Sequence, residues 1–327
     1  MRKVLMVLIA IAAISGVAFA APAKFAFYVQ APHPYFDKVT EGVDAFAKEF
    51  GIDVKKQVGP DWNMDSENTG VLALAADGYN FFEIYPADAS AANGLFDEIV
   101  KKGGKVVTEG ASTMTPTPAS FCVRTDIKQS AIDAAEFIIA KMGKKGTLVN
   151  VLEVLEDPNT KLRRDGIMQV AAKYPGVKLS EVAGIKSEQE AIEKIEGAVA
   201  AGGGYVDGII CTGYVPTVAL SKFLTDYQAK NSKHIAGVGI DDDPVTLKAV
   251  QDWVLDGFVA QNPYGHGYLS LLALKYLSEG WKPRPGAYDI NAGIVVVTKA
   301  NIGSYAADLT KVTNQIKGDM TKKYLTR

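Results

Sequence analysis

The chain has 327 residues, with 35 basic and 37 acidic side chains and a net charge of −2. This balance provides no excess of positive charge that would favour nucleic acid or another polyanion as a partner. Two cysteines and three histidines, without the spacing of metal ligands, predict no metal site. The length is near the upper limit for one hydrophobic core, so two lobes of roughly 150 residues each are expected.

The first twenty residues have the pattern of a cleavable export signal. Arg2 and Lys3 precede an uncharged apolar run from 4 to 14, and the small residues Ala18 and Ala20 follow it. The run is shorter than the ~20 apolar residues that a membrane span needs. We therefore expect cleavage after Ala20 and a free protein in the periplasm, with no lipid anchor because no cysteine follows the run.

Short apolar segments alternate with longer amphipathic ones in the first part of the chain. Strands are predicted at 25–29, 52–58 and 81–85 and from 106 onward, and helices over the segment that carries Val39, Val43, Phe46 and Phe50, at 66–77 and at 89–102. This alternation is typical of a parallel sheet with helices on both faces.

The alternation pauses near 121–126 and then starts again. Helices are predicted at 127–142, 160–173, 188–201, 216–229 and 244–251, and strands at 147–152, 177–182, 206–211, 235–240 and 257–260. A long helix at 264–279 and strands near 288–297 look like the chain crossing back between lobes. The sequence thus predicts an α/β protein with two doubly wound, Rossmann-like lobes, whose parallel sheets are joined by a three-segment hinge.

Both lobes are expected to be discontinuous in sequence. After the signal at 1–20, residues 21–125 and 262–290 are assigned to the N-terminal lobe, and residues 126–261 and 291–327 to the C-terminal lobe. Cys122 and Cys211 each lie in an apolar, strand-rich stretch. Sequence leaves their pairing open and favours buried free thiols.

Ligands bind outside the carboxyl ends of strands in open parallel sheets, so the residues that follow strands are the candidate site. His33, Pro34, Tyr35 and Phe36 follow the first predicted strand. An aromatic ring covers the apolar C–H face of a sugar, while polar groups satisfy its hydroxyls. Core packing is the alternative for the aromatic pair, but its position at a strand end favours ligand contact.

Polar side chains follow the other predicted strands. They are Glu109 after the strand from 106, Asn159 and Arg163 after 147–152, Tyr214 after 206–211, Asp241 after 235–240 and Gln261 after 257–260. Planar groups with paired donors or acceptors suit adjacent hydroxyls. In contrast, Asp88 and Asp243 are expected to cap helices and Arg164 to be a solvated helix charge, while Trp62 is either a cleft lid or simple packing.

The sequence resembles the periplasmic sugar-binding proteins of bacterial ABC transporters, in particular the ribose- and glucose-binding class with the periplasmic-binding-protein type I fold. The matching segments are His33-Pro34-Tyr35-Phe36, Ile84-Tyr85-Pro86-Ala87-Asp88, Val107-Thr108-Glu109, Arg163-Arg164-Asp165-Gly166, Gly237-Val238-Gly239-Ile240-Asp241 and Ala260-Gln261-Asn262-Pro263-Tyr264. They extend over nearly the whole chain in the family's order, and this shared order carries the resemblance.

For the N-terminal lobe, the resemblance implies that Tyr35 and Phe36 are the ring-stacking aromatics and that His33 holds a polar contact. Glu109 matches an aspartate that accepts hydrogen bonds from sugar hydroxyls.

For the C-terminal lobe, Arg163 matches the family's guanidinium, with Asn159 one turn earlier on the same helix face. Asp241 and Gln261 match its acidic and amide partners, and Asp126 matches the first hinge crossing.

Several positions depart from the family pattern. Glu109 is one methylene longer than the usual aspartate, and Gly110 replaces the arginine of ribose binders. Gly213 stands in place of an asparagine and Ile185 in place of a stacking aromatic, for which Tyr214 is a candidate substitute. We therefore expect a polyhydroxylated ligand whose shape differs from ribose.

The expected function is that of a periplasmic solute-binding protein, which closes its hinge on a monosaccharide or polyol and delivers it to a membrane permease. We expect a monomer without cofactor, metal or nucleic acid, and a chemoreceptor partner stays open. A sugar-modifying enzyme is the first alternative, but no G-x-G-x-x-G follows the first strand, and Glu109 and Asp241 lack a positioned water or leaving group. A sugar sensor of the repressor type is the second, and the export signal argues against it. We expect no enzymatic activity.

Overall fold

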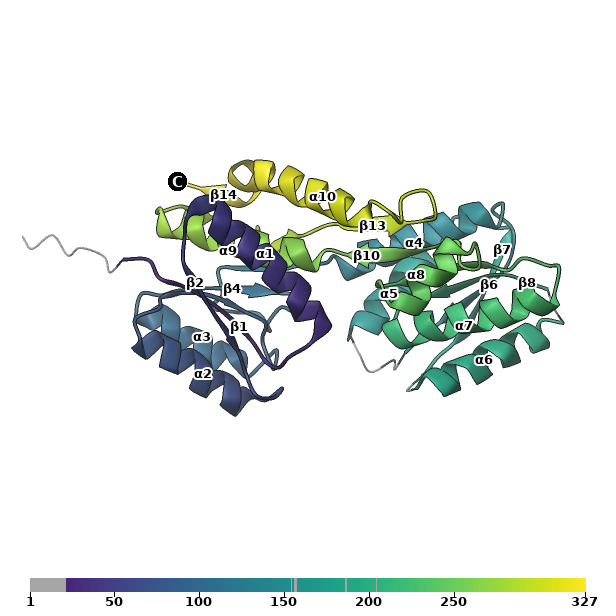
Figure 1. Cartoon of the computed structure of the whole chain (residues 1–327), viewed down its shortest axis with the longest axis horizontal. Coiled ribbons are helices and arrows are strands. Elements are labelled where there is room, and N and C mark those ends of the chain that lie inside the picture. The colour runs from purple at the N-terminus through teal and green to yellow at the C-terminus, as the bar shows by residue number, and fades with distance from the viewer. Residues whose placement is uncertain (1–21, 154, 156–157, 186, 204) are drawn as a thin grey trace, which may run out of the picture.

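The structure is a computed structural model that describes residues 22–327 except 154, 156–157, 186 and 204. Two lobes lie side by side, each built on a six-stranded sheet with helices on both faces (Figure 1). This confirms the predicted α/β architecture. The expected export signal at 1–20 lies outside the described residues. Within the described part of the chain, no helix has the length and apolar character needed to cross a membrane.

The first lobe contains a fully parallel sheet with the strand order β12-β5-β4-β3-β1-β2. Its elements are β1 (Phe25–Val29), α1 (Pro34–Phe50), β2 (Val54–Val58), α2 (Met64–Ala76), β3 (Phe81–Ile84), α3 (Ala92–Lys101), β4 (Lys105–Glu109), β5 (Phe121–Arg124), α9 (Pro263–Ser278) and β12 (Asp289–Asn291). Helices α1 and α9 cover one face and α2 and α3 the other. The central strands β1 and β3 are therefore buried on both sides, whereas the edge strands β2 and β12 carry exposed polar residues.

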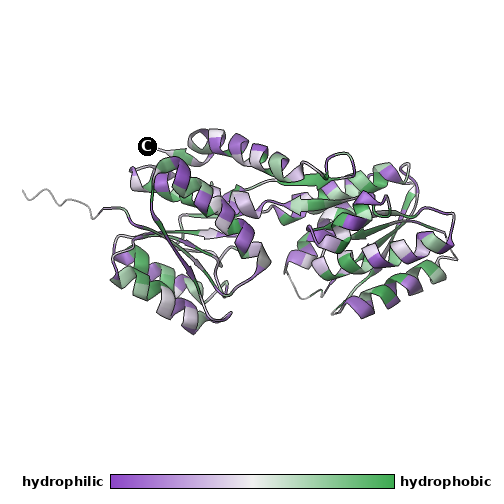
Figure 2. Cartoon of the chain, in the orientation of Figure 1, coloured by the Kyte–Doolittle hydropathy of each residue, from purple (hydrophilic) through white to green (hydrophobic). Residues whose placement is uncertain are grey.

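The second lobe repeats this design with the strand order β13-β10-β9-β8-β6-β7. Its elements are α4 (Ile127–Lys141), β6 (Gly146–Val151), α5 (Pro158–Ala171), β7 (Val177–Val182), α6 (Glu188–Ala201), β8 (Val206–Cys211), α7 (Tyr214–Lys230), β9 (Ala236–Ile240), α8 (Pro244–Gln251), β10 (Gly257–Gln261) and β13 (Ile294–Val297). Strand β13 is antiparallel to β10, the one departure from the predicted parallel order. In both lobes the apolar residues gather along the strands and the helix faces that cover them (Figure 2).

The chain crosses between the lobes three times: after β5, between β10 and α9, and between β12 and β13. Hydrogen bonds hold these crossings side by side. The Asn262 side chain donates to the carbonyl of Ala292 at 2.7 Å, and the amide of Asp126 donates to the Asn291 side chain at 3.3 Å. The predicted three-segment hinge is thus present.

The C-terminal segment was not predicted in detail and joins both lobes. It consists of α10 (Tyr305–Asp319), a π-helical turn (Met320–Tyr324) and β14 (Leu325–Thr326), which pairs with β11 (Lys282–Pro283). Leu309 packs in a core of the second lobe, whereas Met320 and Leu325 are buried in a core of the first. The sequence assigned 291–327 to the C-terminal lobe. The last residues differ from that assignment because their apolar side chains are buried against α9 and its neighbours.

Cys122 on β5 and Cys211 on β8 are both free and buried. They lie in the sheets of different lobes. The prediction of buried free thiols is therefore confirmed.

Candidate functional site

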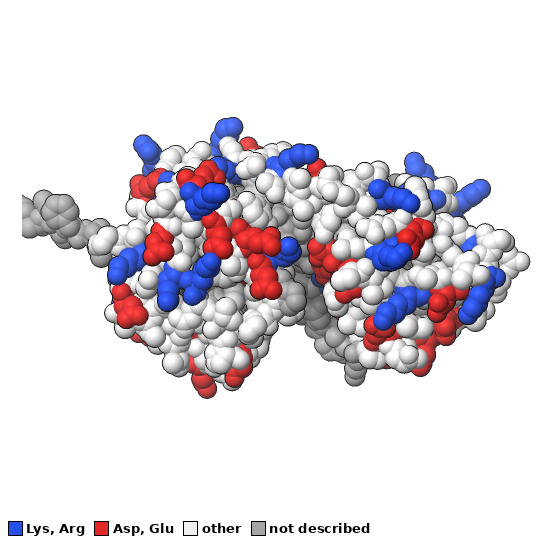
Figure 3. Space-filling model, in the orientation of Figure 1, with Lys and Arg blue, Asp and Glu red and all other residues white. Residues whose placement is uncertain are grey.

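The helices that follow β1 in the first lobe and β6 and β8 in the second begin on the sides where the lobes face each other, with a hollow between them (Figures 1 and 3). The predicted site residues follow the carboxyl ends of strands in both lobes. The hollow opens on the side away from α10 (Figure 3). The candidate residues therefore come from both sides of the hollow between the lobes.

An aromatic cluster forms the wall of the first lobe. The Phe36 ring is buried and stacks against Trp62, with ring centroids 5.9 Å apart and planes inclined by 25°. Tyr85 meets both rings edge-on, at 5.3 Å from Phe36 and 5.2 Å from Trp62. Trp62 stays 51% exposed, so it presents the accessible surface of this stack. Sequence reasoning left Trp62 undecided and did not place Tyr85 in the site.

The loop from β1 to α1 fixes the position of Tyr35. His33 is the N-cap of α1, and its Nδ1 accepts a hydrogen bond from the Tyr35 amide at 3.1 Å. A proline follows at the first helical position, where it suits the helix start. His33 is exposed, and the role that the structure shows for its side chain is that of a helix cap.

Buried polar side chains hold the aromatic cluster from behind. Gln30 Nε2 donates to Glu67 Oε2 and to the carbonyl of Tyr85, both at 2.7 Å. The same Glu67 oxygen accepts from the Ala87 amide at 2.7 Å, and the Ala87 carbonyl accepts from Trp62 Nε1 at 3.2 Å. Sequence reasoning missed this network. Its signal was a glutamine directly after an apolar strand.

Glu109 lies behind Tyr35 and has no exposed surface. The Tyr35 hydroxyl lies 3.0 Å from Glu109 Oε2 and 2.6 Å from Nδ1 of the buried His266, both within hydrogen-bond distance. Burial raises the pKa of Glu109 to about 8, although the Tyr35 hydrogen bond opposes that rise. Burial also lowers the pKa of His266 to about 3, so this ring is neutral. Glu109 therefore reaches the cleft through Tyr35 in this conformation.

The structure gives a reason for the glycine at 110. Gly110 has φ +68°, the left-handed region that favours glycine. A Cβ there would lie 2.6 Å from the Tyr85 ring and 2.7 Å from the Tyr35 hydroxyl. Any residue with a Cβ at this position, arginine included, would collide with the two tyrosines as they stand.

In the second lobe, Asp241 and Gln261 meet at the ends of adjacent strands. Gln261 Nε2 donates to Asp241 Oδ1 at 2.9 Å, and Asp241 adopts φ +68° with its amide bonded to the Val259 carbonyl at 3.0 Å. Burial raises the pKa of Asp241, while the Gln261 hydrogen bond and the charge of Arg163 oppose that rise. Arg163 Nε is buried and has no hydrogen-bond partner. An arginine donor without a partner beside a carboxylate is suited to bind an oxygen-rich ligand.

Other predicted residues are placed differently. Tyr214 is 51% exposed, and its hydroxyl donates to Asp243 Oδ2 at 2.6 Å. It lines a hollow of about 290 Å³ between α6, α7 and α8. Asn159 is exposed on the first turn of α5. Ile185 is buried in the core and does not line the cleft, so no stacking residue is found at that position.

The alternative interpretations of three charged residues can now be judged. Asp88 accepts from the amides of Ser90 and Ala91, both at 2.8 Å, and Asp243 caps α8 through the amide of Val245 at 2.7 Å. The capping prediction is confirmed for Asp243, whereas Asp88 holds the turn before α3, whose N-cap is Ala91 without a side-chain cap bond. Arg164 makes a two-pronged ion pair with Glu181, at 2.9 and 2.7 Å to one carboxylate oxygen, so it is engaged at the edge of the sheet and not in the cleft.

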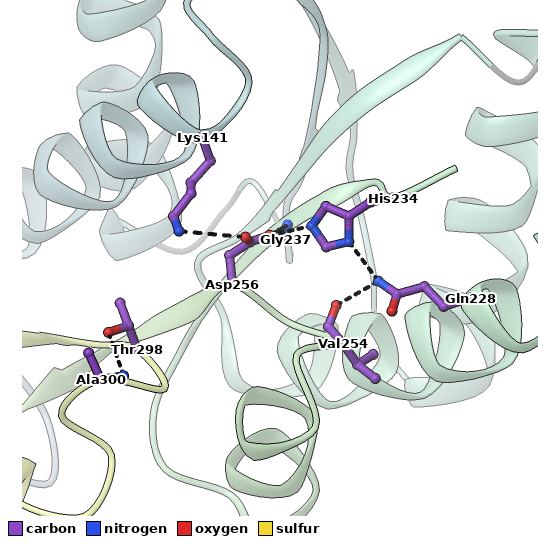
Figure 4. Close-up of polar contacts among 8 residues, drawn as sticks. All are labelled: Lys141, Gln228, His234, Gly237, Val254, Asp256, Thr298 and Ala300. Atoms are coloured by element: carbon purple, nitrogen blue, oxygen red, sulfur yellow. Dashed lines mark hydrogen bonds and ion pairs between the residues drawn. The ribbon is translucent and has the colours of Figure 1, made fainter. Parts of the chain in front are cut away.

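A polar network at the amino ends of the second lobe's strands contains a His–Asp pair, which is relevant to the alternative that the protein is an enzyme. His234 Nε2 lies 3.0 Å from Asp256 Oδ2, and its Nδ1 lies 3.0 Å from Gln228 Nε2 (Figure 4). The two residues precede β9 and β10, so this pair lies at the amino ends of the strands, away from the cleft. Asp256 also accepts from the Gly237 amide at 2.9 Å, which is a structural role. The described residues include no group of three or more His, Cys, Asp or Glu side chains that could hold a metal ion.

The structure thus brings Tyr35, Phe36 and Glu109 together on one wall and Arg163, Asp241 and Gln261 on the other. Every hydrogen bond described above for Tyr35, Glu109, Asp241 and Gln261 stays within its own lobe. Among these four described residues, no such bond crosses from one half-site to the other.

Comparison with known proteins agrees with this architecture. The sequence model described as "Periplasmic binding protein domain" matches residues 25–282. The xylitol-binding protein of Mycolicibacterium smegmatis is 25% identical over 177 residues, which are 52% of this chain and 48% of that protein. The chain therefore aligns with about half the length of this curated relative.

Solved structures show the same fold. The sugar-binding protein of a sugar ABC transporter from Bacillus halodurans has a TM-score of 0.78 at 17% identity, covering 87% of this chain and all of that one (100%). An arabinose-binding protein from Geobacillus stearothermophilus has a TM-score of 0.76 at 18% identity, covering 87% and 99% of the two chains. A periplasmic ribose ABC transporter structure from Conexibacter woesei has the same TM-score, 0.76, and identity, 18%, over 87% and 95%. With the sequence model matching most of its length, the chain belongs to the periplasmic binding protein family.

Proposed function

We propose that this protein is the solute-binding component of an ABC transporter and binds one monosaccharide or related polyol between its lobes. The observation that carries this proposal is the pairing of two unlike half-sites across a hinged cleft. An aromatic stack on the first lobe faces an arginine, a carboxylate and an amide on the second. The names of three relatives support the same ligand class: a xylitol-binding protein, an arabinose-binding protein and a ribose ABC transporter.

The two walls suit different parts of one small molecule. The exposed Trp62 ring, backed by the buried Phe36 ring, offers an apolar face to C–H groups, as sugar rings require. Arg163, Asp241 and Gln261 offer donors and acceptors to adjacent hydroxyls. Contacts with both walls form together only when the lobes approach, so a ligand shifts the hinge equilibrium toward the closed form.

We further propose that the chain is exported by the signal at 1–20 and acts in the periplasm as a monomer. A closed, loaded form would then be recognised by a membrane permease. We propose no catalytic step, no cofactor and no nucleic acid partner. A chemoreceptor partner is not part of the proposal.

The proposal is tested by thermal unfolding of the protein without its signal, alone and with xylitol, D-ribose, D-arabinose, D-glucose, D-galactose or myo-inositol. Specific binding to the folded state must raise the unfolding midpoint, and the rise must grow with ligand concentration. We expect this for at least one compound and not for maltose, which is too large for a site built for one ring. Mass spectrometry of small molecules that co-purify extends the panel. No shift with any compound and no co-purified sugar or polyol would contradict the proposal.

A further inference from the structure

A buried chain of hydrogen bonds leads from the aromatic wall to the hinge. It runs from Glu109 at the end of β4 to the Tyr35 hydroxyl (3.0 Å) and then to His266 Nδ1 (2.6 Å). Nε2 of the same ring lies 3.4 Å from the Thr125 hydroxyl, which directly precedes the first crossing. His266 lies on the first turn of α9, just after the second crossing. The chain therefore links Tyr35 to two of the three hinge segments.

The number of hydrogens in this chain is limited. A phenol has one hydrogen and can donate to one of its two neighbours, so the other neighbour must donate to it. The neutral imidazole has one N–H as well. If Glu109 carries a proton, it donates to Tyr35, Tyr35 donates to His266, and His266 donates to Thr125. All four groups are then bonded without any buried charge.

Loss of the proton reverses the chain. Tyr35 must then donate to the Glu109 carboxylate, His266 must change tautomer to donate to Tyr35, and Thr125 must donate to His266. Glu109 Oε1 has no hydrogen-bond partner, and within the described residues no lysine or arginine lies within ion-pair distance of this carboxyl group. A buried carboxylate without a cation or a full set of donors is costly.

The other ionisable groups around Glu109 also lack positive charge. They are Tyr35 on α1, Glu83 on β3 and Tyr85 just after it, Cys122 on β5 and His266 on α9. Glu83 has no exposed surface and no partner for either oxygen, and burial together with the Glu109 charge raises its pKa well above the ordinary value. Burial raises the pKa of Tyr85 and Cys122 to about 12. Glu109 is therefore the member of this set that is expected to change charge near pH 8.

We propose that Glu109 and His266 are positioning residues, which hold the Tyr35 ring in place through the uncharged form of this chain, so that ligand affinity falls when loss of the Glu109 proton reverses the chain and leaves a buried carboxylate with one unpartnered oxygen. Tyr35 meets Phe36 edge-on at 5.3 Å and Tyr85 at 6.3 Å. A displaced Tyr35 therefore disturbs the whole aromatic wall. The effect on affinity rests on the proposed sugar or polyol binding, whereas the proton itself does not.

The direction of the pH effect follows from linkage. If the liganded form keeps the proton, affinity is constant below the pKa of Glu109 in the free protein and falls as pH rises through it. With that pKa at about 8, the dissociation constant at pH 9 is expected to be about tenfold higher than at pH 7.

The proton is tested first in the protein without ligand. Infrared difference spectra between pH 7 and pH 9 should show the loss of a carbonyl band of a protonated carboxylic acid. The Glu109→Gln variant should lack this change. The control is Glu49→Gln, which alters a carboxyl group of the same lobe that is bonded to Tyr268 and Lys317 at the other end of α1, and it should keep this change. No band change in the wild-type protein, or the same change in Glu109→Gln, overturns the inference.

The positioning role is tested by titration calorimetry with xylitol, D-ribose and D-arabinose at both pH values. We expect the tenfold loss in wild type and in Glu49→Gln, and a dissociation constant independent of pH in Glu109→Gln, whose amide can donate to Tyr35 at either pH. Affinity that is constant or rises with pH in wild type overturns the positioning role. If the infrared change is present but none of the sugars binds, the proposed function fails with the positioning role, while the buried proton stands.

Discussion

The two walls of the cleft are built on opposite principles. On the first lobe, Phe36 is fully packed, Glu109 is buried behind Tyr35, and the Gln30 and Glu67 side chains hold the loop beneath Trp62. On the second lobe, Arg163 keeps a donor nitrogen without a partner, and Asp241 is bonded to the single side chain of Gln261. The same fold thus supports one wall whose accessible surface is aromatic, with buried carboxyl groups packed behind it, and one wall that presents an unpartnered guanidinium nitrogen beside a carboxylate.

This difference indicates how the binding energy is divided. A preformed aromatic wall loses little conformational freedom on binding and contributes through contact area. A buried donor without a partner gains a full hydrogen bond when the ligand supplies an oxygen. We therefore expect the second lobe to determine affinity most strongly and the first lobe to determine which ring shape fits.

The largest effect is expected from Arg163→Ala. A charge-assisted hydrogen bond contributes about 1.5–3 kcal/mol, so losing the guanidinium should weaken binding about 10- to 150-fold and remove the ligand-induced rise in unfolding midpoint. Arg164→Ala is the matched control, because this neighbouring arginine pairs with Glu181 instead. Unchanged affinity in Arg163→Ala would remove the second wall from the site.

A smaller effect, on folding, is expected from Gly110→Ala. The left-handed backbone and the contact with Tyr35 and Tyr85 should destabilise the protein by about 1–3 kcal/mol, measured as a lower midpoint in urea. Gly94→Ala, in α3 with nothing within 4 Å of the added carbon, should instead stabilise it by about 0.5–1 kcal/mol. If both substitutions changed the unfolding midpoint equally, the packing of Tyr35 and Tyr85 around Gly110 would be looser than described above.

The smallest effect is expected from Trp62→Ala. Loss of one stacking surface should weaken binding by about 1 kcal/mol, or roughly fivefold, and Trp62→Phe should restore most of it. Trp253 is the control, since it is 63% exposed and follows α8, away from the strand ends that line the cleft. If Trp253→Ala weakened ligand binding as much as Trp62→Ala does, this would argue against a specific aromatic wall.

Most of the fold could be predicted from sequence because its signals are local. Apolar runs of strand length alternate with helical periodicity, and the predicted elements agree with the observed ones to within a few residues. The prediction failed at α10, although Tyr305, Leu309 and Ile316 recur at helical spacing. That helix packs on both lobes at once, and the periodicity of one segment does not reveal such a long-range contact.

The candidate site was predictable in its position and less so in its details. Tyr35 and Asp241 follow the ends of β1 and β9, as expected from the topology of parallel sheets, and their contact with a ligand stays a prediction. Burial was not predictable: Glu109 and Glu83 have no exposed surface, and the latter interrupts an apolar strand. The burial of a carboxyl group depends on which rings cover it, as Tyr35 covers Glu109. Which rings do so is determined by tertiary packing and cannot be inferred from local sequence.

The approach of the two walls is tested most directly by small-angle X-ray scattering of the protein with and without saturating sugar or polyol. If both half-sites bind one molecule, the lobes must move together, so the radius of gyration should decrease on addition of the compound that raises the unfolding midpoint. Arg163→Ala at the same ligand concentration should keep the larger value. Scattering that is unchanged when that compound is bound would contradict closure of the two lobes on a shared ligand.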